Sequence, residues 1–226
     1  MARLRKISNT EKMDKVTDKL LDESQYYKSE TSKKTIVIHH TAGGPNPINV
    51  IHGWNLNQER VGTAYVIGGK PDKTKSYQDG EIFRAFDDKY WAHHLGCKVE
   101  NNTELNKQSI GIEICNWGQL IKKTDGKFYN YVNKEVPIDE VIDLGNKFRG
   151  FQYYHAYTQK QLESTRELIK HLCAKYNING IYMPVMWDVN PSALSGAGGI
   201  WSHISYRSDK NDCSPQPQLI NMLKNI

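Results

Sequence analysis

A run of β-branched residues that ends in two histidines constrains the fold of this chain more than any other stretch does. Residues 35–38 read Thr-Ile-Val-Ile, and His39 and His40 follow shortly before a pair of glycines. An apolar run without polar alternation is typical of a strand buried on both faces. The end of a rigid strand is a suitable place from which to present an imidazole to a site. We therefore expect a buried strand here, with a functional site at its carboxyl end.

A second stretch, near the carboxyl end of the chain, contains partners for His39. His203 and Cys213 lie there in a polar sequence. Two imidazoles and one thiolate form a zinc-binding set that leaves one coordination position open for water. The neighbouring Asp212 is an alternative third ligand, although a thiolate is the softer and better donor to zinc. A purely structural zinc site is disfavoured because such sites normally have four protein ligands.

A carboxylate stands inside the apolar run that we predict as a strand over residues 109–115. This carboxylate belongs to Glu113, which stands between Ile112 and Ile114. A charged side chain in such a run is energetically costly unless it is paired or functional. Glu113 is therefore a candidate functional residue.

Composition narrows the class of protein. The 226 residues include 30 basic and 25 acidic ones, and the net charge of +5 is scattered along the chain. This balance suits an anionic polymer such as a cell-wall glycan, but it does not predict nucleic-acid binding. No stretch approaches the roughly 20 apolar residues of a membrane span, and no apolar segment follows the basic amino terminus. We expect a protein without a membrane partner, made without a cleaved signal.

The cysteines do not predict a disulfide framework or a cysteine nucleophile. There are four of them, at positions 97, 115, 173 and 213, and none forms a Cys-x-x-Cys pair. That number is too low for a disulfide-stapled scaffold, so buried reduced thiols are expected at Cys115 and Cys173. A Cys/His hydrolase is set aside because no helix begins at Cys213.

The order of the local patterns indicates an α/β fold. Strand-type runs also cover residues 61–67 and 81–86, helix-type patterns cover 8–28, 47–58, 158–176 and 218–226, a polar hairpin-like insertion covers 117–137, and a loop covers 187–200. Ser8 and Glu11 form a possible capping box for the first helix, and Thr158 and Gln161 form one for the third. Strands alternating with helices predict one α/β domain, a central sheet flanked by helices.

These stretches, taken in order, resemble the zinc N-acetylmuramoyl-L-alanine amidases, a family that includes phage lysozyme-amidases, recycling amidases and peptidoglycan recognition proteins. The resemblance rests on residues 36–42, 61–67, 91–94, 109–113 and 203–215. Several motifs in the right order make it specific. It implies an amidase-like catalytic domain over residues 33–226. The helix-type pattern before that domain predicts a helical extension over residues 1–32.

The resemblance also implies the roles of individual residues. The family's zinc ligands correspond to His39, His203 and Cys213, which leaves His40 as a neighbour. Other members use a glutamate in a Gly-Ile-Glu pattern, which Glu113 matches, for proton transfer. Zn²⁺ is thus the expected cofactor.

Two departures from the family pattern concern helper residues. Many phage members have a catalytic tyrosine after the glycine of the second strand, where this chain has Thr63, and Tyr65 follows two positions later. Some members place a lysine two residues before the third ligand to stabilise the oxyanion. Here Asn211 occupies that place if Cys213 is the ligand, and Lys210 stands one residue earlier.

An aromatic and imidazole-rich segment is the candidate substrate-binding region. Tyr90, Trp91 and His93 belong to it, and Thr63 comes from the second strand of the pattern. His93 is an alternative oxyanion donor, and the aromatic side chains together with Trp54 are candidates for packing against sugar faces. Trp54 is equally well explained as a core residue.

The reaction that the resemblance implies is hydrolysis of the amide that joins the lactyl group of N-acetylmuramic acid to L-alanine. The expected partner is peptidoglycan or soluble muropeptides, and we expect a monomer. A phage-type endolysin, made in the cytoplasm and acting on the wall after release, is the leading interpretation. The alternatives are a cytoplasmic enzyme that recycles muropeptides and a recognition module that binds peptidoglycan without cleaving it. Cys213 and Glu113 argue against the recognition module.

Overall fold

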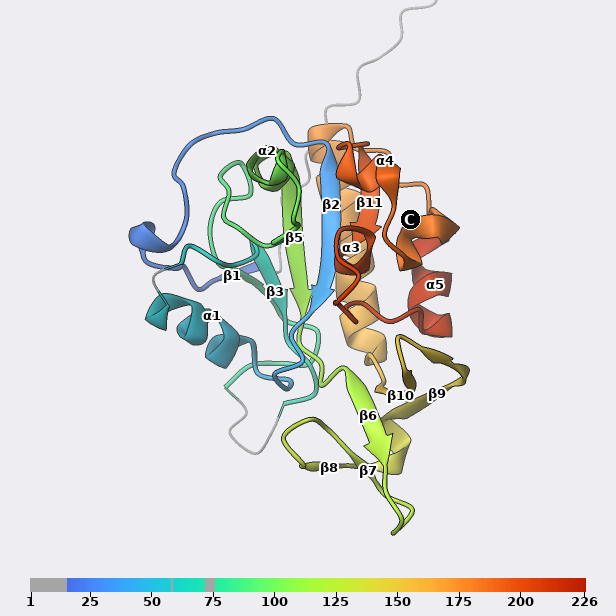
Figure 1. The fold of residues 1–226 in the computed structure, drawn as a ribbon. Coiled ribbons are helices and arrows are strands. Elements are labelled where there is room, and N and C mark those ends of the chain that lie inside the picture. The colour runs from blue at the N-terminus through green and yellow to red at the C-terminus, as the bar shows by residue number, and fades with distance from the viewer. Residues whose placement is uncertain (1–15, 58, 72–75) are drawn as a thin grey trace, which may run out of the picture.

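A mixed six-stranded sheet lies at the centre of the computed structural model, which describes residues 16–57, 59–71 and 76–226 (Figure 1). Its strands are β1 (Val16–Asp18), β2 (Thr35–His40), β3 (Tyr65–Ile67), β4 (Ile82–Arg84), β5 (Ser109–Ile114) and β11 (Gly199–Ser202). Their order is β1-β4-β3-β5-β2-β11, and every neighbouring pair is parallel except β3 and β4. Since β5, β2 and β11 run in one direction, their carboxyl ends meet at one edge of the sheet.

The two central strands are buried along their whole length, as the apolar runs predict. All residues of β2 and of β5 are buried, and Ile36, Val37 and Ile38 have no exposed surface. Burying a side chain of this size contributes roughly 1.5–3 kcal/mol. His39 and His40 therefore end a strand that belongs to the hydrophobic core.

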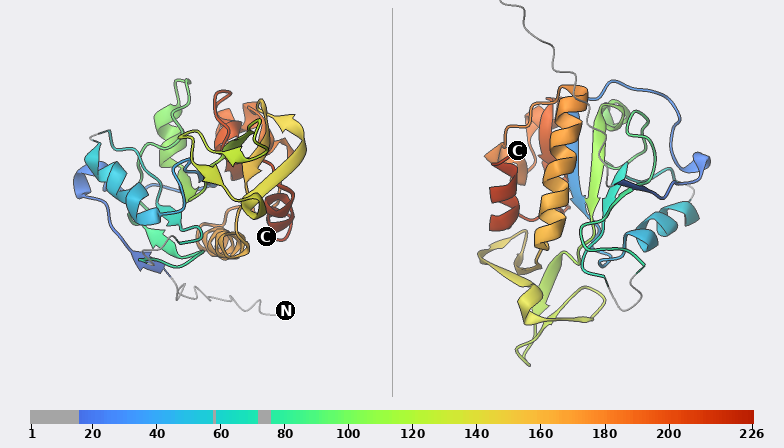
Figure 2. Two further views of the ribbon diagram at one scale, coloured as in Figure 1. Left: turned by 90° about the horizontal axis from the view of Figure 1, so that it is seen from below. Right: turned by 180° about the vertical axis from the view of Figure 1, so that it is seen from behind.

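Helices cover the sheet. They are α1 (Pro47–Leu56), α2 (Asn102–Lys107), α3 (Gln159–Tyr176), α4 (Pro191–Leu194) and α5 (Pro217–Leu223), with short 3-10 turns η1 (Glu23–Gln25), η2 (Ile138–Glu140), η3 (Pro184–Trp187) and η4 (His203–Ser205). Figure 2 shows α3 lying lengthwise against one face of the sheet, with α5 beside it. The predicted capping box of α3 is confirmed, because Thr158 and Gln161 bond to each other's backbone N–H groups. No helix in the described part of the chain combines the length and apolar character needed to cross a membrane.

The predicted helix over residues 8–28 is wrong for the part that the structure describes. Val16–Asp18 forms strand β1 and pairs in parallel with β4, and η1 follows. Leu20, which the apolar face of a helix here would bury, is 57% exposed, while Leu21 is 4% exposed. Pairing with the edge of the sheet has outweighed the local periodicity. Residues 8–15 lie outside the described residues, and the domain boundary at residue 32 stays a prediction.

A second sheet occupies the predicted insertion and continues well beyond residue 137. Its antiparallel strands are β6 (Gln119–Lys122), β7 (Phe128–Tyr129), β8 (Glu135–Val136), β9 (Val141–Phe148) and β10 (Phe151–His155), in the order β8-β7-β6-β10-β9. It has its own small core of Leu120, Phe128 and Val136. In Figure 1 it lies beyond the carboxyl ends of β2 and β5. The insertion therefore stands next to the edge where the site is expected.

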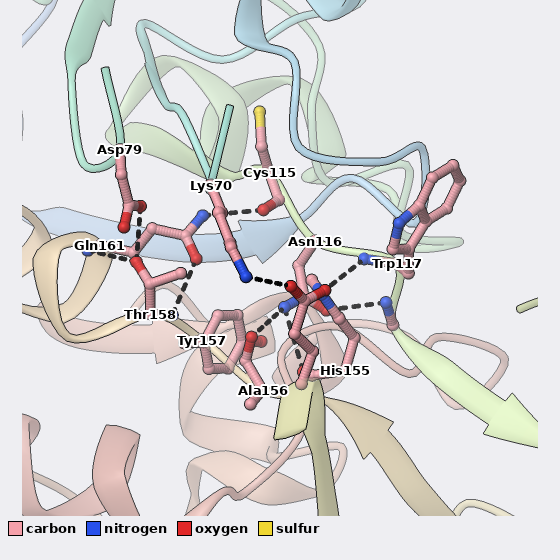
Figure 3. A network of polar contacts seen from close by, with 12 residues as sticks. Lys70, Asp79, Cys115, Asn116, Trp117, His155, Ala156, Tyr157, Thr158 and Gln161 are labelled. Carbon is pink, nitrogen blue, oxygen red and sulfur yellow. Dashed lines mark hydrogen bonds and ion pairs between the residues drawn. The ribbon is translucent and has the colours of Figure 1, made fainter. Parts of the chain in front are cut away.

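A buried polar network fixes this second sheet to the central one (Figure 3). The Asn116 side chain, just after β5, donates to the carbonyl of His155 at 3.1 Å and accepts from the N–H of Gly118 at 2.7 Å. At the start of α3, Gln161 donates to the carbonyl of Cys115 at 2.7 Å. The ends of β5 and β10 and the first turn of α3 are thus held together by backbone-directed hydrogen bonds.

Strand β11 is missing from the sequence-based assignment, which predicts a loop over residues 187–200. Gly199–Ser202 pairs in parallel with β2 and is buried throughout, and Trp201 is 1% exposed. The strand is short and follows glycines, so its pattern resembles that of a loop. It nevertheless determines where His203 lies.

A buried carboxylate joins β3 to α3 and gives the fold a measurable pH dependence. Asp88 accepts hydrogen bonds from Tyr65 Oη (2.8 Å), Lys175 Nζ (2.7 Å) and Tyr176 Oη (2.6 Å). Burial raises the pKa of Asp88, but the bonds from Lys175, Tyr176 and Tyr65 outweigh it and the pKa is lowered. A carboxyl group with a lowered pKa in the folded state stabilises it above the unfolded pKa, about 3.9.

Replacing Asp88 with Asn is therefore expected to reduce the free energy of unfolding by about 2 kcal/mol at pH 7, because it removes a buried charged acceptor that two tyrosine hydroxyls and the partly exposed Lys175 share. The wild type should lose this contribution as the pH falls below about 4, towards the lowered folded pKa. Urea unfolding of both proteins at pH 7 and pH 3 measures it. The same difference in the free energy of unfolding between wild type and variant at pH 7 and at pH 3 would contradict the lowered pKa of Asp88.

Candidate active site

Two adjacent parallel strands bring the two predicted histidines together. Ile38 of β2 pairs with Ser202 of β11, so His39 and His203 are the next residues along each strand. Their rings lie 4.4 Å apart, centroid to centroid, and both are buried. Their proximity thus follows from strand register.

Asp212, and not Cys213, completes the cluster. Its Oδ2 lies 2.9 Å from Nδ1 of His203 and 3.3 Å from Nδ1 of His39. One donor atom from each of these three residues lies within 4.8 Å of the other two. Burial raises the pKa of Asp212, but His203 and His39 outweigh it and hold the pKa well below its usual range. Two imidazoles and one carboxylate suit zinc and match the three-ligand sets of catalytic sites.

Cys213 lies apart from this cluster. It has no exposed surface and contacts the hydroxyl of Tyr157, which in turn lies 3.0 Å from Nδ1 of His40. Burial raises the pKa of the Cys213 thiol well above its usual range. The structure therefore places the side chains of residues 212 and 213 in different surroundings, and the expected thiolate position is taken by a carboxylate.

Glu113 stands opposite His39 on the neighbouring strand. The two residues are paired in the parallel ladder of β2 and β5, and Glu113 is 9% exposed. Burial and the negative charge of Asp212 raise its pKa well above the usual range, while Lys210 opposes the shift. A carboxyl group with a raised pKa beside a cluster of possible metal ligands is suited to accept and return a proton.

These side chains open into a cleft of about 480 Å³. Its lining includes the following residues: His39, His94, Glu113, His203 and Asp212, with Thr63, His93, Arg207 and Lys210 around them and Gln119 from the second sheet. A neighbouring hollow of about 320 Å³ shares Trp54 and Glu113 with it. A cleft of this size, with a few convergent polar groups, is the usual form of a small-ligand site.

The predicted substrate-binding residues divide into two groups. Thr63 and His93 line the cleft, although the Thr63 hydroxyl already donates to the carbonyl of Tyr65 at 2.8 Å. Tyr90 and Trp91 do not line it: Trp91 is 6% exposed and stacks on Tyr27 at 3.9 Å, and Tyr90 stacks on Tyr26. Both aromatic rings pack against Tyr26 and Tyr27 outside this cleft, so a role for them in substrate binding stays a prediction.

One residue of the site, His94, belongs to the motif over residues 91–94, but the sequence assigns it no role of its own. Nδ1 of His94 lies 3.0 Å from Nε2 of His39. The His93-His94 pair is visible in the sequence, but nothing local shows which of the two turns inward. The missing signal is the contact of His94 with β5, a neighbour that is not adjacent in sequence.

The fold and the site define an α/β domain in which two histidines and a carboxylate gather beside a buried glutamate. A family model described as N-acetylmuramoyl-L-alanine amidase matches residues 29–216. The chain therefore belongs to the N-acetylmuramoyl-L-alanine amidase family, as the sequence motifs predict.

Solved structures support the fold. PlyL is 14% identical, with a TM-score of 0.52 over 92% of this chain and 96% of that one. A mutant endolysin from Bacillus subtilis is 16% identical, with a TM-score of 0.52 over 93% and 96% of the two chains. The catalytic domain of XlyA is 16% identical, with a TM-score of 0.50 over 93% and 97%. No curated protein matches the chain.

Proposed function

We propose that this protein is a zinc-dependent amidase that hydrolyses the bond between N-acetylmuramic acid and L-alanine in peptidoglycan. The observation that carries the proposal is the cluster of His39, His203 and Asp212 beside Glu113, in a chain of the amidase family. The donor set fits zinc, since it offers two nitrogen ligands and one oxygen ligand and faces an open cleft.

His39, His203 and Asp212 would hold the metal. Bound zinc would lower the pKa of a coordinated water to about 7 and polarise the scissile carbonyl. Glu113 accepts the proton of the attacking water and passes it to the nitrogen of the leaving L-alanine. Its raised pKa favours holding that proton between the two transfers.

Lys210 is the proposed oxyanion donor. It lines the cleft, and its positive charge is felt at both His39 and Glu113. With Asp212 as the third ligand, Lys210 stands two residues before that ligand, which is the position of the lysine in some family members. The choice of Asp212 thus removes one of the two departures from the family pattern.

Replacing Lys210 with Met is expected to lower kcat by roughly 10²-fold, the lower end of what loss of an oxyanion donor costs. Because Lys210 lowers the pKa of Glu113, the acidic limb of the pH profile should also move to higher pH. Steady-state kinetics from pH 4 to pH 9 measures both effects, with exposed Lys122→Met as the matched control. An unchanged rate and an unchanged limb would remove Lys210 from the site.

The setting of a phage-type endolysin is part of this proposal. It is supported by the mild positive charge, which suits an anionic wall polymer, and by the endolysin among the fold neighbours. Intact peptidoglycan, rather than a soluble muropeptide, should then be the better substrate. A preference for soluble muropeptides would instead favour the recycling enzyme.

Product analysis on purified peptidoglycan tests the function. We expect new amino groups of L-alanine without new reducing sugar ends, since the cut bond is an amide. A zinc chelator should stop their release and added zinc should restore it. Binding to the wall without release of either group would make the protein a recognition module and contradict the proposal.

A further inference from the structure

We propose that His94 is a positioning residue that fixes the orientation and the tautomer of His39, so that Nδ1 of His39 is free to bind the metal. This inference rests on the proposed zinc site. It concerns a side chain outside the ligand set, and it is drawn from a chain of hydrogen bonds whose direction can be worked out atom by atom.

The two ring nitrogens of His39 have different partners. Nδ1 lies 3.3 Å from the Asp212 carboxylate, on the side of the ligand cluster. Nε2 lies 3.0 Å from Nδ1 of His94, and the two rings meet nearly edge to face, at 74°. Only one ring nitrogen of a neutral imidazole has a proton, so the contact with His94 decides which nitrogen of His39 is left as a ligand.

Ser109, at the far end of this chain of hydrogen bonds, determines which atom of each pair is the donor. The Ser109 hydroxyl donates to backbone carbonyl oxygens, of Leu105 at 2.8 Å and of Asn106 at 3.3 Å, which can only accept. Its single proton is therefore used, and Ser109 Oγ must accept from Nε2–H of His94, 2.8 Å away. His94 then has a bare Nδ1, which accepts from Nε2–H of His39. The unprotonated atom of His39 is Nδ1, on the side of the cluster.

His203 reaches the same tautomer through a backbone partner of its Nε2. Its Nε2 lies 2.8 Å from the carbonyl oxygen of Leu95, so it donates there and leaves Nδ1 beside Asp212. Metal-binding histidines commonly donate their second ring N–H to a carbonyl or carboxylate in this way. His94 therefore accepts the Nε2–H of His39, just as the carbonyl of Leu95 accepts the Nε2–H of His203.

The strand beneath His94 is shaped to receive it. A Cβ atom at Gly111 would lie 2.7 Å from Cγ2 of Thr63 and 3.1 Å from Nδ1 of His94. The backbone N–H of His94 is held by the Asn106 side chain at 2.8 Å. A side chain at position 111 would thus displace the nitrogen that accepts from His39, which gives the glycine of the Gly-Ile-Glu pattern a role in the site.

Zinc affinity of the metal-free protein, measured by competition with a chelator, tests this inference without reference to activity. His94→Leu removes the acceptor and is expected to weaken zinc binding 10–100-fold, the usual effect of losing such a partner. His94→Asn places an amide oxygen near the position of Nδ1 and should recover most of that loss. His52→Leu is the matched control, because His52 is exposed on α1 and does not line the cleft, and its zinc affinity should equal the wild type's.

A spectroscopic measurement separates positioning from simple packing. Long-range ¹H–¹⁵N spectra of the zinc-loaded wild type should show His39 and His94 both protonated at Nε2. Ser109→Ala, which removes the acceptor for His94, should disturb the His94 tautomer and weaken zinc binding in the same direction as His94→Leu. If His94→Leu does not fold, His94→Asn and Ser109→Ala provide the comparison.

The outcomes distinguish this inference from the proposed function. A folded His94→Leu protein with wild-type zinc affinity, or a His39 ring protonated at Nδ1, overturns the role of His94. A wild type that binds zinc but cleaves no muramoyl amide overturns the proposed function, and the zinc affinities still decide the role of His94. A wild type that binds no zinc overturns both.

Discussion

Glu113→Gln is expected to bind zinc normally and to lose activity by roughly 10²–10⁴-fold, the usual contribution of a general acid–base residue. The substitution keeps the size of the side chain but removes its ability to take a proton. Glu113 lies opposite His39 in the β2–β5 ladder and is 9% exposed, so the amide should fit the same space. The loss should appear in kcat, because the proton is transferred during the reaction and not during binding.

Zinc content, thermal unfolding and steady-state kinetics of Glu113→Gln measure this together. Glu163→Gln on the exposed side of α3 is a suitable control, since it makes the same chemical change away from the cleft. The wild type should also lose activity as the pH falls through the raised pKa of Glu113, because only the ionised carboxylate accepts a proton. Activity within a factor of about ten of the wild type would remove Glu113 from the mechanism.

Asp212→Ala is expected to weaken zinc binding by more than the 10–100-fold that loss of an outer partner costs, whereas Cys213→Ser should keep it within a few-fold. The reason is geometric: the Asp212 carboxylate contacts both imidazoles, and the Cys213 thiol contacts Tyr157 instead. Two adjacent residues that are both good zinc ligands thus make a matched pair of variants. Chelator competition on each metal-free protein measures the difference.

The opposite result would be equally informative. If Cys213→Ser loses zinc and Asp212→Ala keeps it, the thiolate is the ligand. Circular dichroism of both variants serves as the control for folding, because the two side chains are buried. Loss of zinc binding in both variants, with the fold kept, would mean that Asp212 alone does not complete the site.

His39 and Glu113 are the site residues that local sequence pattern identifies best. Both residues lie in apolar β-branched runs, and both strands are buried along their whole length. Burial on both faces appears directly in the residues as an absence of polar alternation. The carboxyl end of each run could therefore be identified as a functional edge before the neighbouring strand was known.

The positions of the remaining site residues depend on contacts between segments that are far apart in the sequence. No local sequence pattern shows these contacts. His203 is placed in the site by β11, a strand that contains and follows glycines and pairs with β2. Asp212 and Cys213 are adjacent, so a shift of the loop by one residue would exchange their positions. The sequence does not determine that shift. The sequence around Trp91 fits either a residue that lines a cleft or a residue of the core. Its stacking on Tyr27 in the structure favours the core. Val16–Asp18 forms a strand because it pairs with β4 at the side of the central sheet.

Cleavage of a defined muropeptide in ¹⁸O-labelled water, followed by mass spectrometry of the products, tests the central claim most directly. Water that attacks the lactyl carbonyl leaves its oxygen on the new carboxylate of the sugar product. We therefore predict one ¹⁸O atom on the N-acetylmuramic acid fragment, none on a free peptide that begins with L-alanine, and no product when zinc is removed. Label on the peptide, a cut at another bond, or zinc-independent cleavage would contradict the account.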